Sequence, residues 1–165
     1  MREISVQMGE LAVSADPAAV LVSIGLGSCV GLALVDARAS VAGLAHILLP
    51  GPGDVERRSP CTFAHSGVPA LVSAVTELGA RDLSAVIVGG AHMFGADAAG
   101  RMRVGARNVA AVRMALEAAG IAIVAADTGG ADGRTIRVYL DRALVTARVT
   151  GGTETALLGP IEVAA

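Results

Sequence analysis

Short apolar runs separated by turn residues predict that most of the chain forms β-strands. Three of these runs follow one another at residues 19–24, 30–35 and 41–49. Runs rich in valine, leucine and isoleucine between glycine, proline or aspartate are typical of strands. The last two are separated by Asp36-Ala37-Arg38-Ala39-Ser40, so we expect them to pair as a hairpin.

Further strands are predicted before and after this central part. Residues 4–13 partly alternate between apolar and polar side chains and predict one strand, which leads into a turn at Asp16-Pro17. Later apolar runs lie at residues 83–88, 121–126, 135–140 and 143–149. The last two predict a second hairpin. The small, polar tail from Thr150 predicts either a frayed end or a strand that depends on a partner.

Two segments have the spacing of amphipathic helices instead. In residues 66–78, Ser66 is the predicted N-cap and Pro69 falls in the predicted first turn. Residues 106–119 repeat the apolar spacing and end before Gly120. Strands with two helices predict an α+β fold. A single domain, 1–165, is expected, because domains most often contain about 100–150 residues.

Composition narrows the classes of function. Hydrophobic residues make up 53% of the chain and aromatic residues 2%, so the core must be aliphatic. The net charge is −2, which argues against a nucleic-acid partner. All 13 cationic residues are arginine, which excludes Schiff-base chemistry on lysine.

The cellular compartment is predicted from the lack of targeting features in the sequence. The first residues do not resemble a signal peptide, and no apolar run reaches the roughly 18 residues of a membrane-spanning helix. Cys29 and Cys61 are the two cysteines, so no disulfide framework is expected. We therefore expect a cytoplasmic protein with reduced thiols and no membrane insertion.

The stretch Gly25-Leu26-Gly27-Ser28-Cys29 carries the most distinctive candidate chemistry. A turn flanked by glycines places Cys29 between two predicted strands, where a thiol tends to be exposed and backbone N–H groups can donate to an oxyanion. A dinucleotide-binding loop is disfavoured, because that motif needs a third glycine and a helix directly after the turn. Cys29 is therefore a candidate nucleophile, and a buried structural thiol is the alternative.

His46 lies in the third apolar run and is the candidate general base. A neutral imidazole with one satisfied nitrogen suits that role, although a core histidine bonded to a backbone carbonyl has the same features. His65 and His92 are competitors. Cys61 and His65 have a spacing that can bind metal, but two ligands fall short of a structural zinc site. Neither a metal nor another cofactor is expected.

Five motifs together resemble the CheD family of bacterial chemoreceptor glutamine deamidases. They occur in the family's order, cover about residues 20–150 and are Ile24-Gly25-Leu26-Gly27-Ser28-Cys29-Val30, Ala45-His46-Ile47-Leu48-Leu49-Pro50, Gly89-Gly90-Ala91-His92-Met93-Phe94, Gly105-Ala106-Arg107-Asn108-Val109 and Ala126-Asp127-Thr128-Gly129-Gly130. Five ordered motifs make a more specific match than a single glycine turn.

The resemblance implies a protein-glutamine glutaminase with a Cys–His–Thr site and no cofactor. The family's cysteine corresponds to Cys29, its histidine to His46 and its threonine to Ser23. Serine keeps the hydroxyl that orients the histidine but lacks the methyl group that restricts χ1. The implied fold is a β-sandwich-like core of mixed sheets with helices packed outside, and it resembles the catalytic fold of the bacterial necrotizing-factor toxins.

The resemblance also implies the partners. The expected substrates are glutamines on the cytoplasmic helices of chemoreceptors, with hydrolysis of glutamate methyl esters as a side activity. The alternative role is an adaptor that binds a CheC-type chemotaxis phosphatase, with or without activity. Retention of both Cys29 and His46 favours an active enzyme.

Two finer expectations concern Cys29 and Phe94. An imidazole beside a thiol is expected to lower the pKa of that thiol, so we expect Cys29 to react faster than Cys61. Phe94 is one of three aromatic residues. It is expected either to fill the core or to line the rim of the Cys29 site, where it would contact a protein partner.

Overall fold

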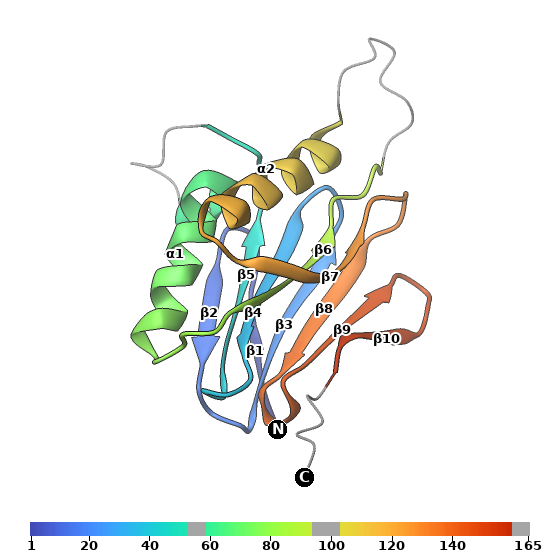
Figure 1. Cartoon of the computed structure of the whole chain (residues 1–165). Helices are drawn as coiled ribbons and strands as arrows, with labels where there is room; N and C mark the ends of the chain where they lie inside the picture. The colour runs from blue at the N-terminus through green and yellow to red at the C-terminus, as the bar shows by residue number, and fades with distance from the viewer. Residues whose placement is uncertain (53–58, 94–102, 160–165) are drawn as a thin grey trace.

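The computed structural model describes residues 1–52, 59–93 and 103–159, and it places their strands in two five-stranded sheets (Figure 1). Sheet A consists, in spatial order, of β1 (Arg2–Ser5), β3 (Ala19–Leu26), β8 (Arg134–Tyr139), β9 (Leu144–Val149) and β10 (Glu154–Leu158). Sheet B consists of β2 (Leu11–Ser14), β5 (Val41–Ile47), β4 (Val30–Asp36), β6 (Ser84–Gly89) and β7 (Ala122–Thr128). Both sheets are mixed, because β1 pairs with β3 and β6 with β7 in parallel.

Two helices cover the outer face of sheet B, α1 (Ala64–Glu77) and α2 (Val104–Ala118) (Figure 1). Two short 3₁₀ turns, η1 (Pro60–Thr62) and η2 (Leu140–Arg142), complete the described elements. The observed architecture, mixed sheets with helices outside, confirms the predicted α+β fold and the predicted arrangement of its layers.

Sheet B is buried on both of its faces. Between the sheets lies one aliphatic cluster, which includes Leu21, Leu26, Ala33, Val35, Leu44, Val86, Ile136 and Val138. Between sheet B and the helices lies a second cluster, which includes Leu32, Leu34, Ile47, Leu71, Val75, Ile87, Val112 and Leu116. Since every residue of β4 is buried, that strand is a nearly continuous apolar run rather than an alternating one.

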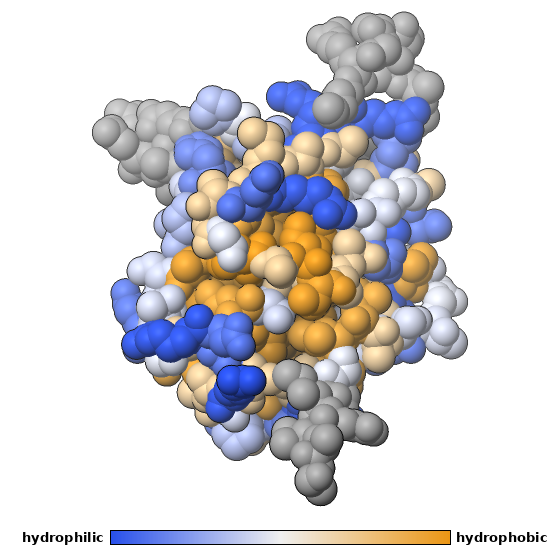
Figure 2. Space-filling view, in the orientation of Figure 1, coloured by the Kyte–Doolittle hydropathy of each residue, from blue (hydrophilic) through white to orange (hydrophobic). Residues whose placement is uncertain are grey.

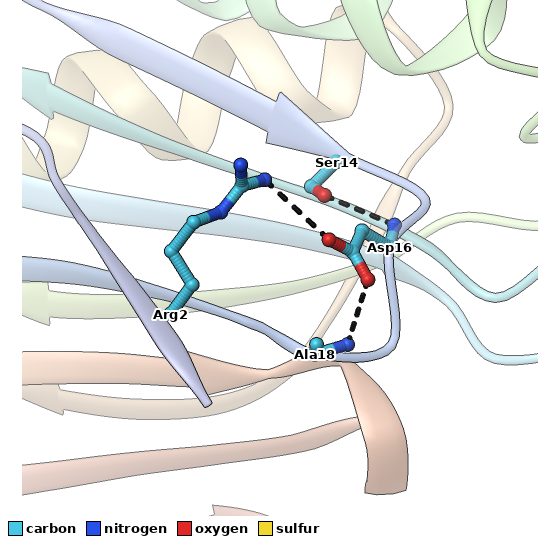
Figure 3. A network of polar contacts seen from close by, with 4 residues as sticks. All are labelled: Arg2, Ser14, Asp16 and Ala18. Atoms are coloured by element: carbon cyan, nitrogen blue, oxygen red, sulfur yellow. Dashed lines mark hydrogen bonds and ion pairs between the residues drawn. The ribbon is translucent and has the colours of Figure 1, made fainter.

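The turn between β2 and β3 carries the chain from sheet B to sheet A. The Oδ1 atom of Asp16 accepts a hydrogen bond from the N–H of Ala18 at 2.9 Å, and its Oδ2 atom pairs with Arg2 at 3.4 Å (Figure 3). The N–H of Asp16 donates to Ser14 Oγ at 3.0 Å. These contacts fix the start of β3, the strand that later supplies Ser23.

The strand predicted over residues 4–13 is wrong in one respect, because the structure divides it between the sheets. β1 pairs with β3, whereas β2 pairs with β5. The break lies at residues 6–10, where the N–H of Gly9 donates to the carbonyl of His46 and the N–H of His46 donates to the carbonyl of Glu10. These long-range bonds replace local strand continuation and bring the N-terminal segment next to His46.

The predicted start of the first helix is also corrected. α1 begins at Ala64, Phe63 occupies the N-cap without a side-chain hydrogen bond, and Pro69 lies inside the helix. The N–H of Ala64 donates to the carbonyl of Leu49, so a tertiary contact satisfies a group that a capping side chain would otherwise satisfy. Ser66, the predicted N-cap, instead donates its hydroxyl to the carbonyl of Pro60.

The C-terminal tail forms a strand within this chain. β10 pairs antiparallel with β9 as the edge of sheet A. Its first residue, Glu154, accepts hydrogen bonds from the hydroxyls of Tyr139 and Thr146. The expectation of a frayed or partner-dependent tail is therefore wrong for these residues, because side chains of β8 and β9 hold β10 in place.

The face seen in Figure 2 carries a broad apolar area at its centre, over the region of the helices and β7. Part of it is a groove between α1 and α2, lined by Pro69, Val72, Ala115, Ala118 and other small side chains. Neither of the described helices is long and apolar enough to cross a membrane.

Candidate active site

Ser23 lies on the face of β3 that packs between the sheets, because it follows the buried Leu21 by two residues, and a bulge comes directly after it. Ser23 pairs with Ile136 of β8, but the next registered pair is Leu26 with Arg134, so three steps on β3 match two steps on β8. Ser23 and Leu26 are both buried, whereas the intervening Ile24 is 66% exposed. The irregularity therefore returns Leu26 to the buried face that Leu21 and Ser23 occupy, while Ile24 points to the surface.

His46 reaches the same space from β5 and contacts Ser23. Its Nδ1 atom lies 2.9 Å from Ser23 Oγ, and Ser23 Oγ lies 2.8 Å from the carbonyl oxygen of Val6. The carbonyl can only accept, so the single hydroxyl proton is donated to Val6. Ser23 Oγ must then accept from Nδ1–H, and this fixes the imidazole tautomer with its lone pair on Nε2.

The environment of His46 favours a neutral imidazole. The residue is 1% exposed. Burial lowers the pKa of His46 below its usual 6.5, although the carbonyl of Val6 acts in the opposite direction. Nε2 is buried and has no hydrogen-bond partner among the described residues, the Cys29 thiol included. A neutral ring with an unengaged lone pair is the form that a general base requires.

Cys29 lies directly before β4 on the same face of sheet B as His46. Gly31 is the registered partner of His46, and Cys29 precedes Gly31 by two residues, so the two side chains point to the same side. Cys29 also packs against the cluster between the sheets. Cys29 is adjacent to Val30, which pairs with Ile47, so the thiol and the imidazole are near neighbours across the end of the β4–β5 pairing.

The backbone around Cys29 is held by the segment that follows β6. The N–H of Gly90 donates to the carbonyl of Cys29 at 2.8 Å, and the N–H of Ala91 donates to the carbonyl of Gly27 at 2.7 Å. Cys29 as a residue is partly exposed. A partly exposed cysteine on a fixed turn agrees with the expected placement of Cys29 and does not fit a fully buried structural thiol.

The expected direction of the Cys29 pKa is corrected by the structure. Burial raises the pKa of the Cys29 thiol above its usual 9.0, and its own backbone N–H lowers it by less. Because His46 is neutral and is not hydrogen-bonded to the thiol, it supplies no charge that would stabilise a thiolate. The resting state is therefore a neutral thiol beside a neutral imidazole.

The competing residues lie in other surroundings. Cys61 is fully buried in the cluster on the helix side of sheet B, and burial raises its pKa to about 11. His65 is exposed and stacks on Phe63. Among the residues that the structure describes, no three His, Cys, Asp or Glu side chains group closely enough to hold a metal ion.

Sequence reasoning missed two groups at this site. One is the carbonyl of Val6, which a chain pattern cannot reveal because it arrives through tertiary pairing. The other is Asn108, a fully buried polar residue on α2. Its spacing from Val112 and Leu116 places it in the apolar stripe of the helix, and a polar residue in such a stripe is a signal that could have been used.

Several large apolar side chains are exposed near these elements. Met8 is 68% exposed in the loop that contacts His46, Ile24 lies in the β3 bulge, and Met93 is 48% exposed and packs beside Gly27. Each of these exposed apolar side chains is a candidate for contact with a protein partner. Phe94, for which two roles were expected, lies outside the described residues.

A thiol, a neutral imidazole and a hydroxyl that orients it define a candidate cysteine-hydrolase site, and comparison with known proteins gives the family. The model of the family described as CheD chemotactic sensory transduction matches residues 48–149. A probable chemoreceptor glutamine deamidase CheD of Archaeoglobus fulgidus is 38% identical over 154 residues, 92% of this chain and 96% of the relative.

Two other relatives agree. The chemoreceptor glutamine deamidase CheD of Thermotoga maritima is 38% identical over 149 residues, which cover 89% of this chain and 92% of the relative. A probable chemoreceptor glutamine deamidase CheD of Haloarcula marismortui is 37% identical over 140 residues, 84% of this chain and 80% of the relative. The chain belongs to the CheD family.

Proposed function

We propose that this protein is a chemoreceptor glutamine deamidase in which Cys29 is the nucleophile, His46 the general base and Ser23 the residue that orients the base. The observation that supports this most directly is the hydrogen-bond chain from His46 Nδ1–H through Ser23 to the Val6 carbonyl, because it leaves Nε2 as a lone-pair acceptor. The names of the curated relatives supply the reaction class.

The first half of the reaction forms a thioester. Nε2 of His46 takes the thiol proton as the sulfur of Cys29 attacks the side-chain amide carbon of a glutamine. The amide oxygen gains negative charge in the tetrahedral intermediate, where the backbone N–H of Cys29 can stabilise it. The C–N bond then breaks, the imidazolium returns its proton to the nitrogen, and ammonia leaves.

The second half regenerates the enzyme. A water molecule gives one proton to Nε2 and adds to the thioester carbon. When the C–S bond breaks, the imidazolium returns the proton to the sulfur, so the products are a glutamate side chain and the free thiol. Every proton moves through one nitrogen, and the proposed reaction requires neither a metal nor an organic cofactor.

The neutral resting state suits this sequence of steps. Burial raises the pKa of Cys29 and lowers the pKa of His46, so both groups keep the forms from which the reaction starts across the neutral range. The thiolate forms as attack proceeds, and the charge then separates onto the imidazolium and the oxyanion. Ser23 favours this separation, because its oxygen accepts from Nδ1–H more strongly when the ring is charged.

The names of the relatives suggest a chemoreceptor glutamine as the substrate, and we propose that this glutamine lies on a cytoplasmic helix of the receptor. The exposed Met8, Ile24 and Met93 are candidates for contacting apolar side chains of the substrate. The same side chains favour a second candidate role, in which the protein is an adaptor for a CheC-type chemotaxis phosphatase. The two roles differ in whether Cys29 is needed.

The test is incubation of purified protein with a receptor cytoplasmic fragment, followed by ammonia assay and mass spectrometry of the peptides. We expect the mass gain of amide-to-acid conversion at particular glutamines. Cys29→Ala should abolish it, while the matched Cys61→Ala should retain it, since Cys61 lies in a different core. Conversion that survives in Cys29→Ala would refute the assignment, and partner binding without conversion would favour the adaptor role.

A further inference from the structure

Asn108 of α2 joins the two chain segments that carry Cys29 and His46. The side chain is completely buried. Its Nδ2 atom donates to the carbonyl of Ser28 at 2.9 Å and to the carbonyl of Leu48 at 2.7 Å. Ser28 directly precedes Cys29, and Leu48 follows His46 by two residues, so one amide group is bonded to both segments.

These bonds lie where the pairing of the two strands ends. The last registered pair of β4 and β5 at this end is Val30 with Ile47. Beyond this pair, the two segments of the chain are no longer joined by β-sheet hydrogen bonds to each other. Cys29 lies in this unpaired part. The amide of Asn108 bridges the strands at the position where the next ladder bonds would otherwise act.

The orientation of the Asn108 amide is determined by its partners. Both partners are carbonyl oxygens, which only accept, so the NH₂ group must face them; a flipped amide would place Oδ1 against two other oxygens. Oδ1 is buried without a hydrogen-bond partner among the described residues. The Asn108 amide therefore lies on the apolar face of α2 although its Oδ1 atom has no hydrogen bond. An apolar side chain of similar size would not carry the free-energy cost of that unsatisfied oxygen.

We infer that Asn108 is a positioning residue for catalysis: it fixes the separation of the Cys29 turn from the His46 strand, and so the geometry of proton transfer between thiol and Nε2. The inference rests on the proposed function of these two residues. Asn108 acts from the helix side of sheet B, whereas Ser23 acts from the side of sheet A. The base and the nucleophile are thus held from both layers that flank them.

The first test compares Asn108→Leu with Val112→Ala, a change in the same buried stripe of α2 at a side chain that makes no hydrogen bond to either segment. Both are assayed well below their melting temperatures. A loss of positioning predicts that kcat for ammonia release falls about ten-fold or more in Asn108→Leu while KM changes by less than about two-fold. Val112→Ala should lose stability and keep kcat. Equal kcat in both variants would overturn the inference.

The second test needs no substrate. The rate of Cys29 alkylation by iodoacetamide is measured at neutral pH in the wild type, Asn108→Ser, His46→Ala and the double variant. If Asn108 acts through the geometry of the pair, Asn108→Ser slows alkylation about three-fold or more, and this effect disappears in the His46→Ala background. An effect of the same size in both backgrounds, or none in either, would overturn the inference.

The two tests also separate this inference from the proposed function. If the wild type releases no ammonia from any receptor glutamine, the proposed function fails, while the alkylation cycle still decides whether Asn108 positions the pair. Serine at position 108 retains one donor and leaves space instead of adding bulk, so this second variant remains informative if Asn108→Leu does not fold.

Discussion

Ser23 Oγ lies 2.9 Å from Nδ1 of His46 and is itself bonded to the carbonyl of Val6. The geometry makes the serine an acceptor toward the ring, because its only proton is used by the carbonyl. The resemblance to the CheD family implies a threonine at this position, and Ser23 makes the hydroxyl contact that such a threonine is expected to make. What serine lacks is the methyl group that limits rotation about χ1.

Two substitutions of Ser23 therefore test the hydroxyl and the methyl group separately. Ser23→Ala should lower kcat by ten-fold or more, about 1.4 kcal/mol in activation free energy, because the ring then loses the contact that fixes its tautomer. Ser23→Thr should retain or raise kcat. The measurement is steady-state ammonia release from a receptor fragment, with circular dichroism as the check on folding. Full activity in Ser23→Ala would show that the hydroxyl does not orient His46.

The pH dependence of kcat/KM should show one limb on the acid side. Activity needs neutral His46, and burial lowers its pKa below 6.5, so the midpoint of the acid limb should lie below pH 6.5. Burial raises the pKa of Cys29 above 9.0, so the thiol is protonated in the neutral range and the profile should be level from pH 7 to about pH 8. An acid limb centred above pH 6.5 would contradict the assignment of the limb to His46.

Alkylation should distinguish the two cysteines in the native protein. Cys29 is partly exposed, whereas Cys61 is fully buried with a pKa of about 11, so iodoacetamide should modify Cys29 first and Cys61 only on unfolding. The rate at Cys29 should still rise as pH approaches 9, because its pKa is raised. Peptide mapping after timed alkylation gives both rates. Equal rates at the two thiols in folded protein would contradict this ordering.

The sequence predicted the central strands well for a physical reason. β4 and β5 lie between sheet A and the helices, and most of β3 is also buried, so their apolar runs are long and their limits are given by turn residues. The division of residues 4–13 was not predictable, because it depends on pairing with β3 and β5 elsewhere in the chain. The predicted start of α1 was wrong for a similar reason, because the carbonyl of Leu49 accepts the hydrogen bond of the first helical N–H in place of a local capping side chain.

The candidate site was predictable to different degrees. The glycine turn indicated Cys29, and an imidazole in an apolar strand indicated His46, whereas Ser23 came from family resemblance alone. No pattern along the chain reveals that the Val6 carbonyl takes the Ser23 proton, because the contact spans 17 residues. The direction of the Cys29 pKa was mispredicted, since proximity of an imidazole was considered without the burial that keeps it neutral.

Gly89 should be required for the conformation of the Cys29 turn. Its φ is +112°, and a Cβ atom there would lie 2.3 Å from the carbonyl oxygen of Cys29. Gly79 is a matched control, because its φ is +104° and a Cβ atom would meet nothing within 4 Å. Gly79→Ala should cost only the backbone strain, about 1–3 kcal/mol. Gly89→Ala should cost more, because the Cys29 backbone must also move.

Urea unfolding and Cys29 alkylation together test this comparison. Gly89→Ala should lower the free energy of unfolding further than Gly79→Ala and should change the alkylation rate in the folded protein. Gly79→Ala should leave alkylation unchanged, since it follows the C-terminal end of α1. Equal losses of stability with unchanged alkylation in both variants would show that the approach of Gly89 to Cys29 is not restrictive.

Asp36 should stabilise the opposite end of β4 in a pH-dependent manner. Its carboxylate accepts four backbone hydrogen bonds, from the N–H groups of Arg38, Ala39, Arg81 and Asp82, at 2.7–3.1 Å. Burial alone raises the pKa of Asp36, but the four donors outweigh it and the pKa is held below its usual 3.8. The turn after β4 is thereby joined to the connection between α1 and β6.

Since the folded-state pKa of Asp36 is lowered, its stabilisation is present above pH 3.8 and is lost as pH falls through the folded-state value. Asp36→Asn leaves two donors facing an NH₂ group, so at pH 7 it should lower the free energy of unfolding by about 3 kcal/mol, or about 1.5 kcal/mol for each lost charge-assisted bond. The difference from wild type should shrink below pH 3.8. The exposed Asp141, paired with Arg142, provides the control, and Asp141→Asn should change stability by at most about 1 kcal/mol at either pH. A deficit in Asp36→Asn that matches the Asp141→Asn control, or that does not shrink in acid, would contradict the role of the charge.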